Sequence, residues 1–206
     1  MKERGMIFNG EMVRAILDGR KTQTRRPVKF PVHDKKLGCE LAGNELAGEL
    51  SAGNYLNSTF GKPGDRIWVR ETWQAIHDYC DENGHVDERR YARSIPRNRG
   101  NYWHPVYEEA WGNESREDRE FPWRPSIHMP RWASRILLEI TDVRVERLRS
   151  MSQDDARAEG VIAASGPMEA GLAFRELWDS IYGEESWKAN PWVWVIEFKR
   201  VGGGAA

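Results

Sequence analysis

The chain has 206 residues and a formal net charge of -1 at pH 7, from 31 Lys and Arg against 32 Asp and Glu. This length fits one domain with an elaboration, and the balanced charge argues against tight nonspecific binding to a long nucleic-acid duplex. Cys39 and Cys80 are the only cysteines, too few for a disulfide scaffold or a four-cysteine zinc site. No apolar run approaches bilayer length, so we expect a reduced, cytoplasmic protein without a membrane segment.

A cluster of cations and hydroxyl groups follows the first expected helix. Asn9 can cap that helix, whose apolar residues recur at helical spacing, and Gly19 is a natural left-handed stop. Residues 19–26 read Gly-Arg-Lys-Thr-Gln-Thr-Arg-Arg and end at Pro27, which interrupts regular strand pairing. The sequence therefore displays a short turn or strand between a helix end and a proline.

Nucleophilic chemistry is available within this cluster. Arg20, Arg25 and Arg26 crowd Lys21 with like charge, which favours a neutral amine, and a neutral amine can deprotonate a hydroxyl such as that of Thr24. In a straight strand Lys21 and Thr24 point to opposite faces, so their cooperation requires a bend or a helical turn. The alternative interpretation is a solvated basic loop.

Residues 28–59 are rich in small side chains and lack a sustained periodic apolar face, so we expect a surface loop. A strand is expected over residues 66–73, with Ile67, Val69 and Glu71 on one face. A carboxylate that ends a core-facing row either pairs with a cation or lines a pocket.

Residues 74–121 are polar, charged and aromatic without periodicity, which indicates an insertion or a lid. His77, Cys80 and His85 match no recognised metal-ligand spacing, and we expect no metal and no cofactor. The aromatic residues of this insertion either fold over a ligand or form a small core of their own: Tyr102, Trp103, Tyr107 and Trp111.

Three prolines stiffen residues 121–132, and a stiff loop presents its side chains at low entropic cost. Four of these side chains could stack on a base or hold a phosphate: Trp123, Arg124, His128 and Arg131. Alternatively, the loop is a rigid connector that packs Trp123 and Trp132 into the core.

In the last third of the chain, the sequence pattern predicts strands that alternate with helices. A strand is expected over residues 135–148, with a bulge or bend at Thr141-Asp142 where the apolar phase changes. Ser152 caps a short helix that Gly160 ends. Glu159 lies at the carboxyl end of that helix, where the dipole disfavours a negative charge, so Glu159 either serves a pocket or is plainly exposed.

The clearest helix is expected over residues 168–182, with Phe174 and Trp178 in its apolar stripe. A strand apolar on both faces follows over residues 192–198, and such a strand is covered on both sides.

At these residues the chain resembles the ASCH family, a β-barrel class related in fold to the PUA RNA-binding domains. The likeness rests on residues 19–24, Gly64-Asp65, residues 156–160 and the strand 192–201. Residues 124–132 are similar to the longer ASCH proteins of bacteriophages and prophages, which would place the chain in a bacterial host cytoplasm.

The resemblance implies an α+β fold, a PUA-like ASCH β-barrel with flanking short helices and a long insertion. It implies a single domain over residues 1–201, with a loop elaboration at about 28–59, an insertion at about 74–121 and a disordered tail at 202–206. The elaboration and much of the insertion lie outside the compact family pattern.

Small bacterial members of the family are amidohydrolases that remove the acetyl group from N4-acetylcytidine with a lysine, a threonine and a glutamate. Matched residue by residue, these are Lys21, Thr24 and Glu159. The resemblance implies that Thr24 attacks the acetyl carbonyl, Lys21 removes its proton, and Glu159 positions water or protonates the leaving amine. The insertion at 74–121 could reshape the pocket or admit a polymer in place of a nucleoside.

The competing hypothesis is a noncatalytic module that binds short RNA or a modified nucleic acid, with no membrane partner and no oligomeric state assigned. In this hypothesis Arg20, Lys21, Arg25 and Arg26 grip phosphate while Trp73 and Trp123 stack on bases. The residues expected to bind substrate or nucleic acid are Arg20, Thr22, Arg25, Arg26, Arg70, Glu71, Trp73, Trp123, Arg124, His128 and Arg131.

Overall fold

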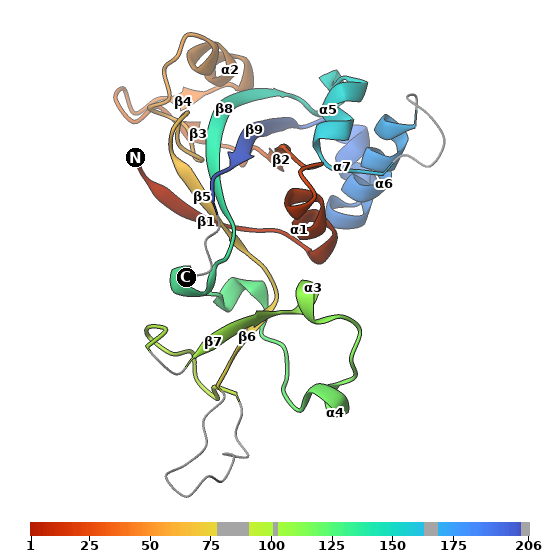
Figure 1. Cartoon of the computed structure of the whole chain (residues 1–206). Coiled ribbons are helices and arrows are strands. Elements are labelled where there is room, and N and C mark those ends of the chain that lie inside the picture. The colour runs from red at the N-terminus through yellow and green to blue at the C-terminus, as the bar shows by residue number, and fades with distance from the viewer. Residues whose placement is uncertain (78–90, 101–102, 163–168, 203–206) are drawn as a thin grey trace, which may run out of the picture. The chain divides into compact units, whose positions relative to one another are not determined.

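The computed structural model describes residues 1–77, 91–100, 103–162 and 169–202 (Figure 1). The strands are β1 (Glu3–Ile7), β2 (Gln23–Pro27), β3 (Val32–His33), β4 (Glu40–Leu41), β5 (Arg66–Arg70), β6 (Trp73–Ile76), β7 (His104–Tyr107), β8 (Leu137–Arg147) and β9 (Trp192–Arg200). The α-helices are α1 (Gly10–Leu17), α2 (Gly43–Ser51), α3 (Glu108–Trp111), α4 (Arg116–Arg119), α5 (Gln153–Ala158), α6 (Ala170–Tyr182) and α7 (Glu184–Ala189). Short 3-10 helices are η1 (Ser126–His128), η2 (Arg131–Ala133) and η3 (Leu148–Ser150).

By its internal contacts the chain forms two compact units. The first unit comprises residues 1–4, 15–67 and 138–201, and the second comprises residues 5–14 and 68–137. The insertion expected at about 74–121 falls wholly within the second unit. Residues 203–206 of the expected tail lie outside the described residues. No described helix combines the length and the apolar character that a membrane crossing requires.

The larger sheet has the strand order β1-β5-β8-β9-β2. Strand β9 pairs antiparallel with both β8 and β2, and its residues Val193 to Ile196 are buried, which confirms the covered strand expected at the end of the chain. β1 and β2 stand at the two ends of this order, so the described strands form an open mixed α+β arrangement and no closed barrel. The expected α+β class is confirmed at this level.

Strand β8 changes its register against β9 between Ile140 and Asp142. Ile140 before the break is buried, and so are Val143 and Val145 beyond it. In an unbroken strand Ile140 and Val143 would point to opposite faces. The extra residue, Thr141, lets the strand keep its apolar side chains inside while it bends. The bulge predicted at Thr141-Asp142 is therefore confirmed.

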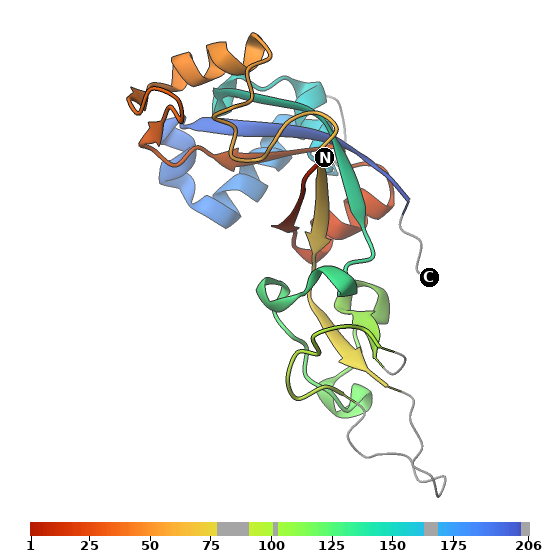
Figure 2. The same ribbon diagram turned by 90° about the vertical axis from the view of Figure 1, so that its left-hand side faces the viewer.

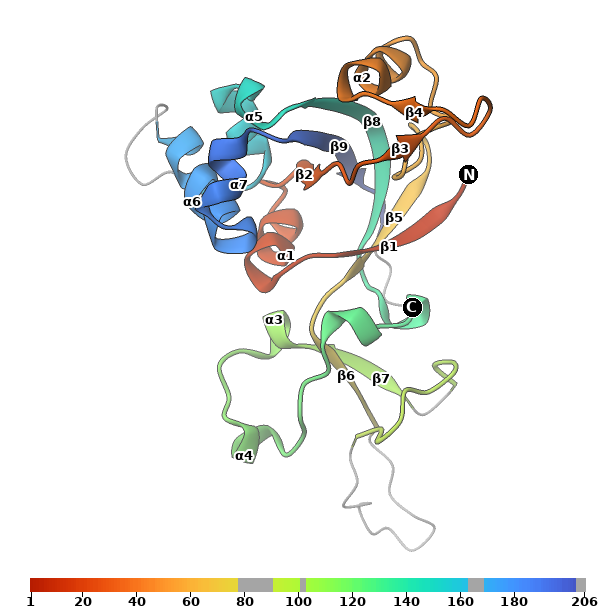
Figure 3. The same cartoon turned by 180° about the vertical axis from the view of Figure 1, so that it is seen from behind.

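Helices α5, α6 and α7 lie together beside the sheet of the first unit (Figures 1 and 3). Phe174 and Trp178 from α6 pack with Val193 and Val195 of β9, as the apolar stripe predicts. Ile181 is 42% exposed although it belongs to the same stripe. It lies in the last turn of α6, next to the helix end at Gly183.

The prediction of a surface loop over residues 28–59 is wrong in the middle of that range, where the chain forms β3, β4 and α2. Leu46 and Leu50, four residues apart on α2, are buried and supply the apolar contact that fixes this helix. Glu45 accepts a hydrogen bond from the backbone N–H of Ala42 at 2.8 Å and so stabilises the first turn. An apolar face of two residues was too short to predict the helix from periodicity.

The second unit is built on the pairing of β6 with β7, drawn in yellow and green in Figure 2. Trp73, Ala75, Met129 and Ala133 form its buried cluster, against which other aromatic side chains pack, among them Trp103, Tyr107 and Trp132. Two of the aromatic residues of the insertion, Trp103 and Tyr107, therefore pack on a core that the insertion shares with Trp73, Met129 and Ala133 outside it. Cys80, His85 and Tyr102 lie outside the described residues.

Two glycines of α2 provide a test of this packing. A Cβ atom at Gly43 would overlap the indole ring of Trp192, whereas a Cβ atom at Gly48 meets nothing within 4 Å. We expect Gly43→Ala to destabilise the protein by about 1–3 kcal/mol and Gly48→Ala to stabilise it by about 0.5–1 kcal/mol. Urea unfolding of both variants measures this, and equal effects of the two changes would contradict the packing of Trp192 on α2.

Candidate active site

The cluster that begins at Lys21 is extended, so its alternate side chains share one face. Lys21 donates its backbone N–H to the carbonyl of Ala15, and Thr22 donates to the carbonyl of Ala158, both at 2.9 Å. Gln23 then begins β2, which pairs with β9. This backbone pairing places the segment next to the end of α5, where Glu159 lies.

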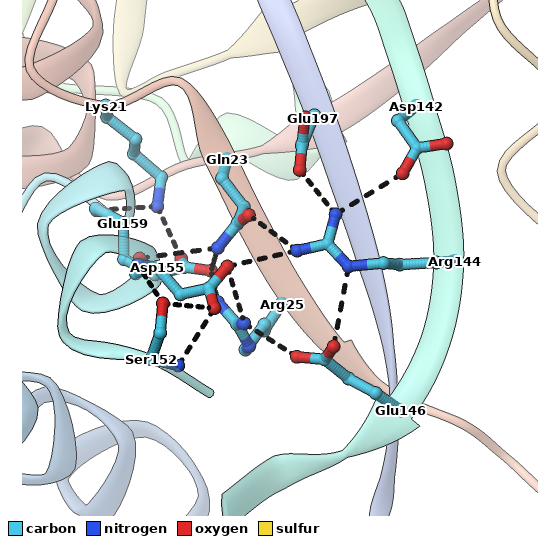
Figure 4. Close-up of polar contacts among 10 residues, drawn as sticks. All are labelled: Lys21, Gln23, Arg25, Asp142, Arg144, Glu146, Ser152, Asp155, Glu159 and Glu197. Carbon is cyan, nitrogen blue, oxygen red and sulfur yellow. Dashed lines mark hydrogen bonds and ion pairs between the residues drawn. The ribbon is translucent and has the colours of Figure 1, made fainter. Parts of the chain in front are cut away.

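Lys21, Gln23 and Arg25 all point at Glu159 (Figure 4). The Lys21 ammonium donates to the Glu159 carbonyl oxygen at 2.8 Å and to its Oε2 at 2.9 Å. Arg25 Nη1 donates to Oε1 of the same carboxylate at 3.0 Å, and Gln23 Nε2 lies 3.5 Å from that oxygen. The side chains of Lys21 and Arg25 are 0% exposed and that of Glu159 is 3% exposed. The centre is a fully buried ion pair with a second cation on the far carboxylate oxygen.

Burial lowers the pKa of Lys21 below its ordinary value of 10.5. Water stabilises a free ammonium, and a buried site removes that water. The Glu159 carboxylate works in the opposite direction, and the like charges of Arg26 and Arg25 add to the lowering. The environment therefore shifts Lys21 toward its neutral, basic form, in the direction that the crowded arginines predicted.

Gly160 brings Glu159 close to Lys21. Its φ of +85° lies in the left-handed region, and a Cβ atom there would stand 2.7 Å from the Lys21 Cβ and 2.8 Å from the Ala15 Cβ. Side chains do not tolerate such approaches, so only glycine lets the end of α5 lie against the Lys21 backbone. The predicted helix stop thus has a second role in building the site.

A second layer of charge surrounds the centre. Arg25 Nη2 contacts Glu146 Oε1 at 2.7 Å and Asp155 Oδ1 at 3.3 Å. Arg144, on β8, contacts Asp155 Oδ1 at 3.0 Å and Gln23 Oε1 at 3.2 Å. The remaining contacts of Arg144 are with Glu146, Asp142 and Glu197. Three cations thus share five carboxylates (Figure 4).

Thr24 lies between Gln23 and Arg25 in β2, and its side chain therefore points to the opposite face of the strand from theirs. It is 1% exposed and pairs across the strands with Ile196. Among the described hydrogen bonds, none joins the Thr24 hydroxyl to Lys21 or Glu159. The structure brings Lys21 and Glu159 together, as expected, but gives no support for direct proton transfer from Thr24 to Lys21.

The other predicted residues of this segment lie outside the buried centre. Arg20 donates to the Gly160 carbonyl at 2.8 Å and pairs with Asp18 at 2.9 Å. Thr22 is exposed and pairs through its backbone. Arg26 is half-buried opposite Trp194.

In the second unit, Glu71 is buried and Arg135 holds it with two bonds of 2.9 and 2.8 Å. Of the two interpretations of this carboxylate, pairing with a cation is confirmed. Trp73 is 0% exposed, so a base cannot stack on it in this structure. Arg124 binds Gln74 Oε1 at 2.8 Å and is therefore part of the fold.

The remaining predicted residues of the second unit lie nearer its surface. Arg70 lies over the ring of Trp68 and donates to the carbonyl of Ile127 at 3.4 Å. Trp123 is half-buried and packs edge-on against Phe121. The exposed ones are His128 and Arg131.

Sequence reasoning missed the outer residues of the charge cluster. Glu146 and Arg144 lie on β8, in a segment predicted as a strand, and neither was assigned a role from the sequence. Asp155 looked like a favourable charge in the first turn of a helix. The signal that could have found Gln23 was its alternation with Lys21 and Arg25. Within the part of the chain that the structure describes, no group of three or more His, Cys, Asp or Glu side chains is placed to hold a metal ion.

Compared with known proteins, the chain matches no family model, no curated protein and no solved structure. The likeness to the ASCH family therefore rests on the quoted motifs alone.

Asp155 offers a test of the charge cluster. Burial acts to raise its pKa, but hydrogen bonds from Ser152 and the charge of Arg25 outweigh it and lower the pKa from 3.8 to about 2. A depressed carboxyl pKa stabilises the fold above the unfolded value, and this contribution is lost as the pH falls toward 2.

We therefore expect Asp155→Asn to cost about 1–2 kcal/mol at pH 7, after allowance for solvent screening at this partly exposed group. The difference from the wild type should shrink between about pH 4 and pH 2. Asp154→Asn is the matched control, because Asp154 is its neighbour on α5 and its side chain is 90% exposed. Urea unfolding across pH measures both, and a cost of Asp155→Asn that does not depend on pH would contradict the assignment.

Proposed function

We propose that this protein is an amidohydrolase of the ASCH, PUA-like class, which removes an acyl group from the exocyclic amine of a modified pyrimidine nucleoside such as N4-acetylcytidine. The observation that carries the proposal is the buried pair of Lys21 and Glu159, with a lysine whose pKa is lowered. The substrate class comes from the resemblance of residues 19–24 and 156–160 to the family. A buried lysine beside a carboxylate suits proton transfer near neutral pH.

In this mechanism the neutral amine of Lys21 takes a proton from the water that attacks the acyl carbonyl. The ammonium formed is stabilised by Glu159, whose Oε2 and carbonyl oxygen both lie within hydrogen-bond distance of Nζ. The same proton then passes to the departing exocyclic amine, so that the products are a carboxylic acid and the free nucleoside. The mechanism requires that substrate binding exposes Nζ, because the Lys21 side chain is fully buried in the structure.

Water is the nucleophile in this proposal because the Thr24 side chain points away from the pair. A threonine nucleophile needs a base within hydrogen-bond reach, and Lys21 lies on the other face of the strand. The reaction then proceeds by direct hydrolysis without an acyl-enzyme.

The binding-module hypothesis is less well supported by this geometry. Lys21 and Arg25 were expected to bind phosphate, but the side chains of both are 0% exposed and form ion pairs with carboxylates. Trp73, expected to stack on a base, is buried. A phosphate entering this cluster would meet more carboxylates than cations, which is unfavourable.

The first test is incubation of the purified protein with N4-acetylcytidine and chromatographic detection of cytidine. We expect turnover by the wild type, and a loss of about 100-fold or more in Lys21→Met, which removes the base, and in Glu159→Gln, which removes the charge that stabilises the ammonium. Thr24→Val decides between the nucleophiles. With water as nucleophile it keeps activity within about threefold of the wild type, whereas a loss as large as that of Lys21→Met assigns the attack to Thr24.

The pH dependence follows from the direction of the Lys21 shift. Only the neutral amine accepts a proton, so kcat/KM should rise with pH through the pKa of Lys21 and level off above it. Because this pKa lies below 10.5, the midpoint of the rise should also lie below 10.5. A rise centred at or above that value would exclude Lys21 as the base.

A further inference from the structure

The two carboxylate oxygens of Glu159 have different partners. Oε2 receives the Lys21 ammonium at 2.9 Å, and Oε1 receives Arg25 Nη1 at 3.0 Å. A carboxylate free at one oxygen can rotate about its last bond, whereas one held at both oxygens cannot. Arg25 therefore fixes the orientation of the Glu159 carboxylate plane beside Lys21.

We propose that Arg25 is a positioning residue of the Lys21–Glu159 centre, which holds the Glu159 carboxylate in a fixed orientation with one oxygen toward the Lys21 amine. This inference rests on the proposed function for its kinetic part only. Arg25 touches neither the amine nor the attacked carbonyl in the mechanism, so it acts through Glu159. None of the sequence motifs pointed to this role, because Arg25 was expected to bind phosphate.

Arg25 is itself held rigidly. Its Nη2 lies on Glu146 and Asp155, its side chain is 0% exposed, and its guanidinium lies 5.9 Å from the centre of the Phe174 ring. Its buried Nε finds no partner among the described residues, so this cation is placed by its two Nη groups alone. Because the planar fork serves carboxylates from α5 and β8 together, a lysine with its single ammonium cannot replace it.

The charge of Arg25 also acts on Lys21. The charged groups that act electrostatically on the Lys21 amine are Glu159 from the end of α5, and Arg25 and Arg26 from β2. Glu159 raises the pKa of Lys21, and the two arginines lower it. Removing the positive charge of Arg25 should therefore raise the pKa of Lys21.

Arg144 provides a matched control from the same cluster. It pairs with carboxylates on β8 and α5, as Arg25 does, but it contacts neither Lys21 nor Glu159. Loss of Arg144 removes ion pairs of a similar kind while the central pair stays intact. A purely structural role of the cluster predicts the same effects for both arginines.

The first measurement is an NMR titration of Lys21 in protein labelled with 13C at lysine, assigned through Lys21→Met. We expect the Lys21 pKa to move upward in Arg25→Gln and to stay at the wild-type value in Arg144→Gln. Arg25→Lys keeps the charge, so Lys21 should titrate close to the wild type there. An unchanged pKa in folded Arg25→Gln, or an equal shift in Arg144→Gln, would overturn the proposal.

The second measurement is turnover of N4-acetylcytidine. We expect Arg25→Lys to lower kcat by about 10–100-fold, with KM within about threefold, because the carboxylate is no longer held while the charge remains. Retention of kcat in Arg25→Lys would overturn the positioning role. If Arg25→Gln does not fold, the kcat of Arg25→Lys alone tests that role. Absence of turnover in the wild type would count against the proposed function, whereas the titration still tests the placement of Arg25.

Discussion

The buried ion pair between Lys21 and Glu159 is the interaction on which the rest of the site depends. A charge moved out of water is costly unless a partner meets it at close range with its hydrogen bonds satisfied. Three features of the backbone meet this condition: the extended segment after α1, Gly160 at the end of α5, and the β-bridge between Lys21 and Glu159. Because Gly160 has no side chain, the two backbones approach closely enough for Nζ to reach both the carbonyl and the carboxylate of Glu159.

The second layer of charge extends this arrangement outward. Arg25 and Arg144 both contact Glu146 and Asp155, and Asp155 also completes the capping box of α5 with the N-cap residue Ser152. The same contacts that place a cation beside Glu159 also fix the start of the helix that carries it. Such a cluster is better suited to holding a proton donor and acceptor in register than to gripping a phosphate, because its cations are already neutralised.

The sequence predicted much of the first unit, since long periodic segments and caps are local signals. Asn9, Ser152 and the phase change at Thr141 each appear in the structure as expected. Helix α2 was missed because its buried face has too few residues to show a period. In the site, motif likeness paired Lys21 with Glu159 correctly, but the placement of Thr24 depends on strand alternation, and Arg144 and Glu146 come from a strand more than 100 residues away. Contacts of that range carry no local signal.

A double-mutant cycle on Lys21→Met and Glu159→Gln, measured by urea unfolding at pH 7, tests the central ion pair most directly. Each single change removes one partner of a buried ion pair and should cost about 3–5 kcal/mol. If the pair is formed as described, the double variant should cost less than the sum of the two by about 2 kcal/mol or more. Costs that add to within about 0.5 kcal/mol would show that the two groups do not interact, and would contradict the account of the site.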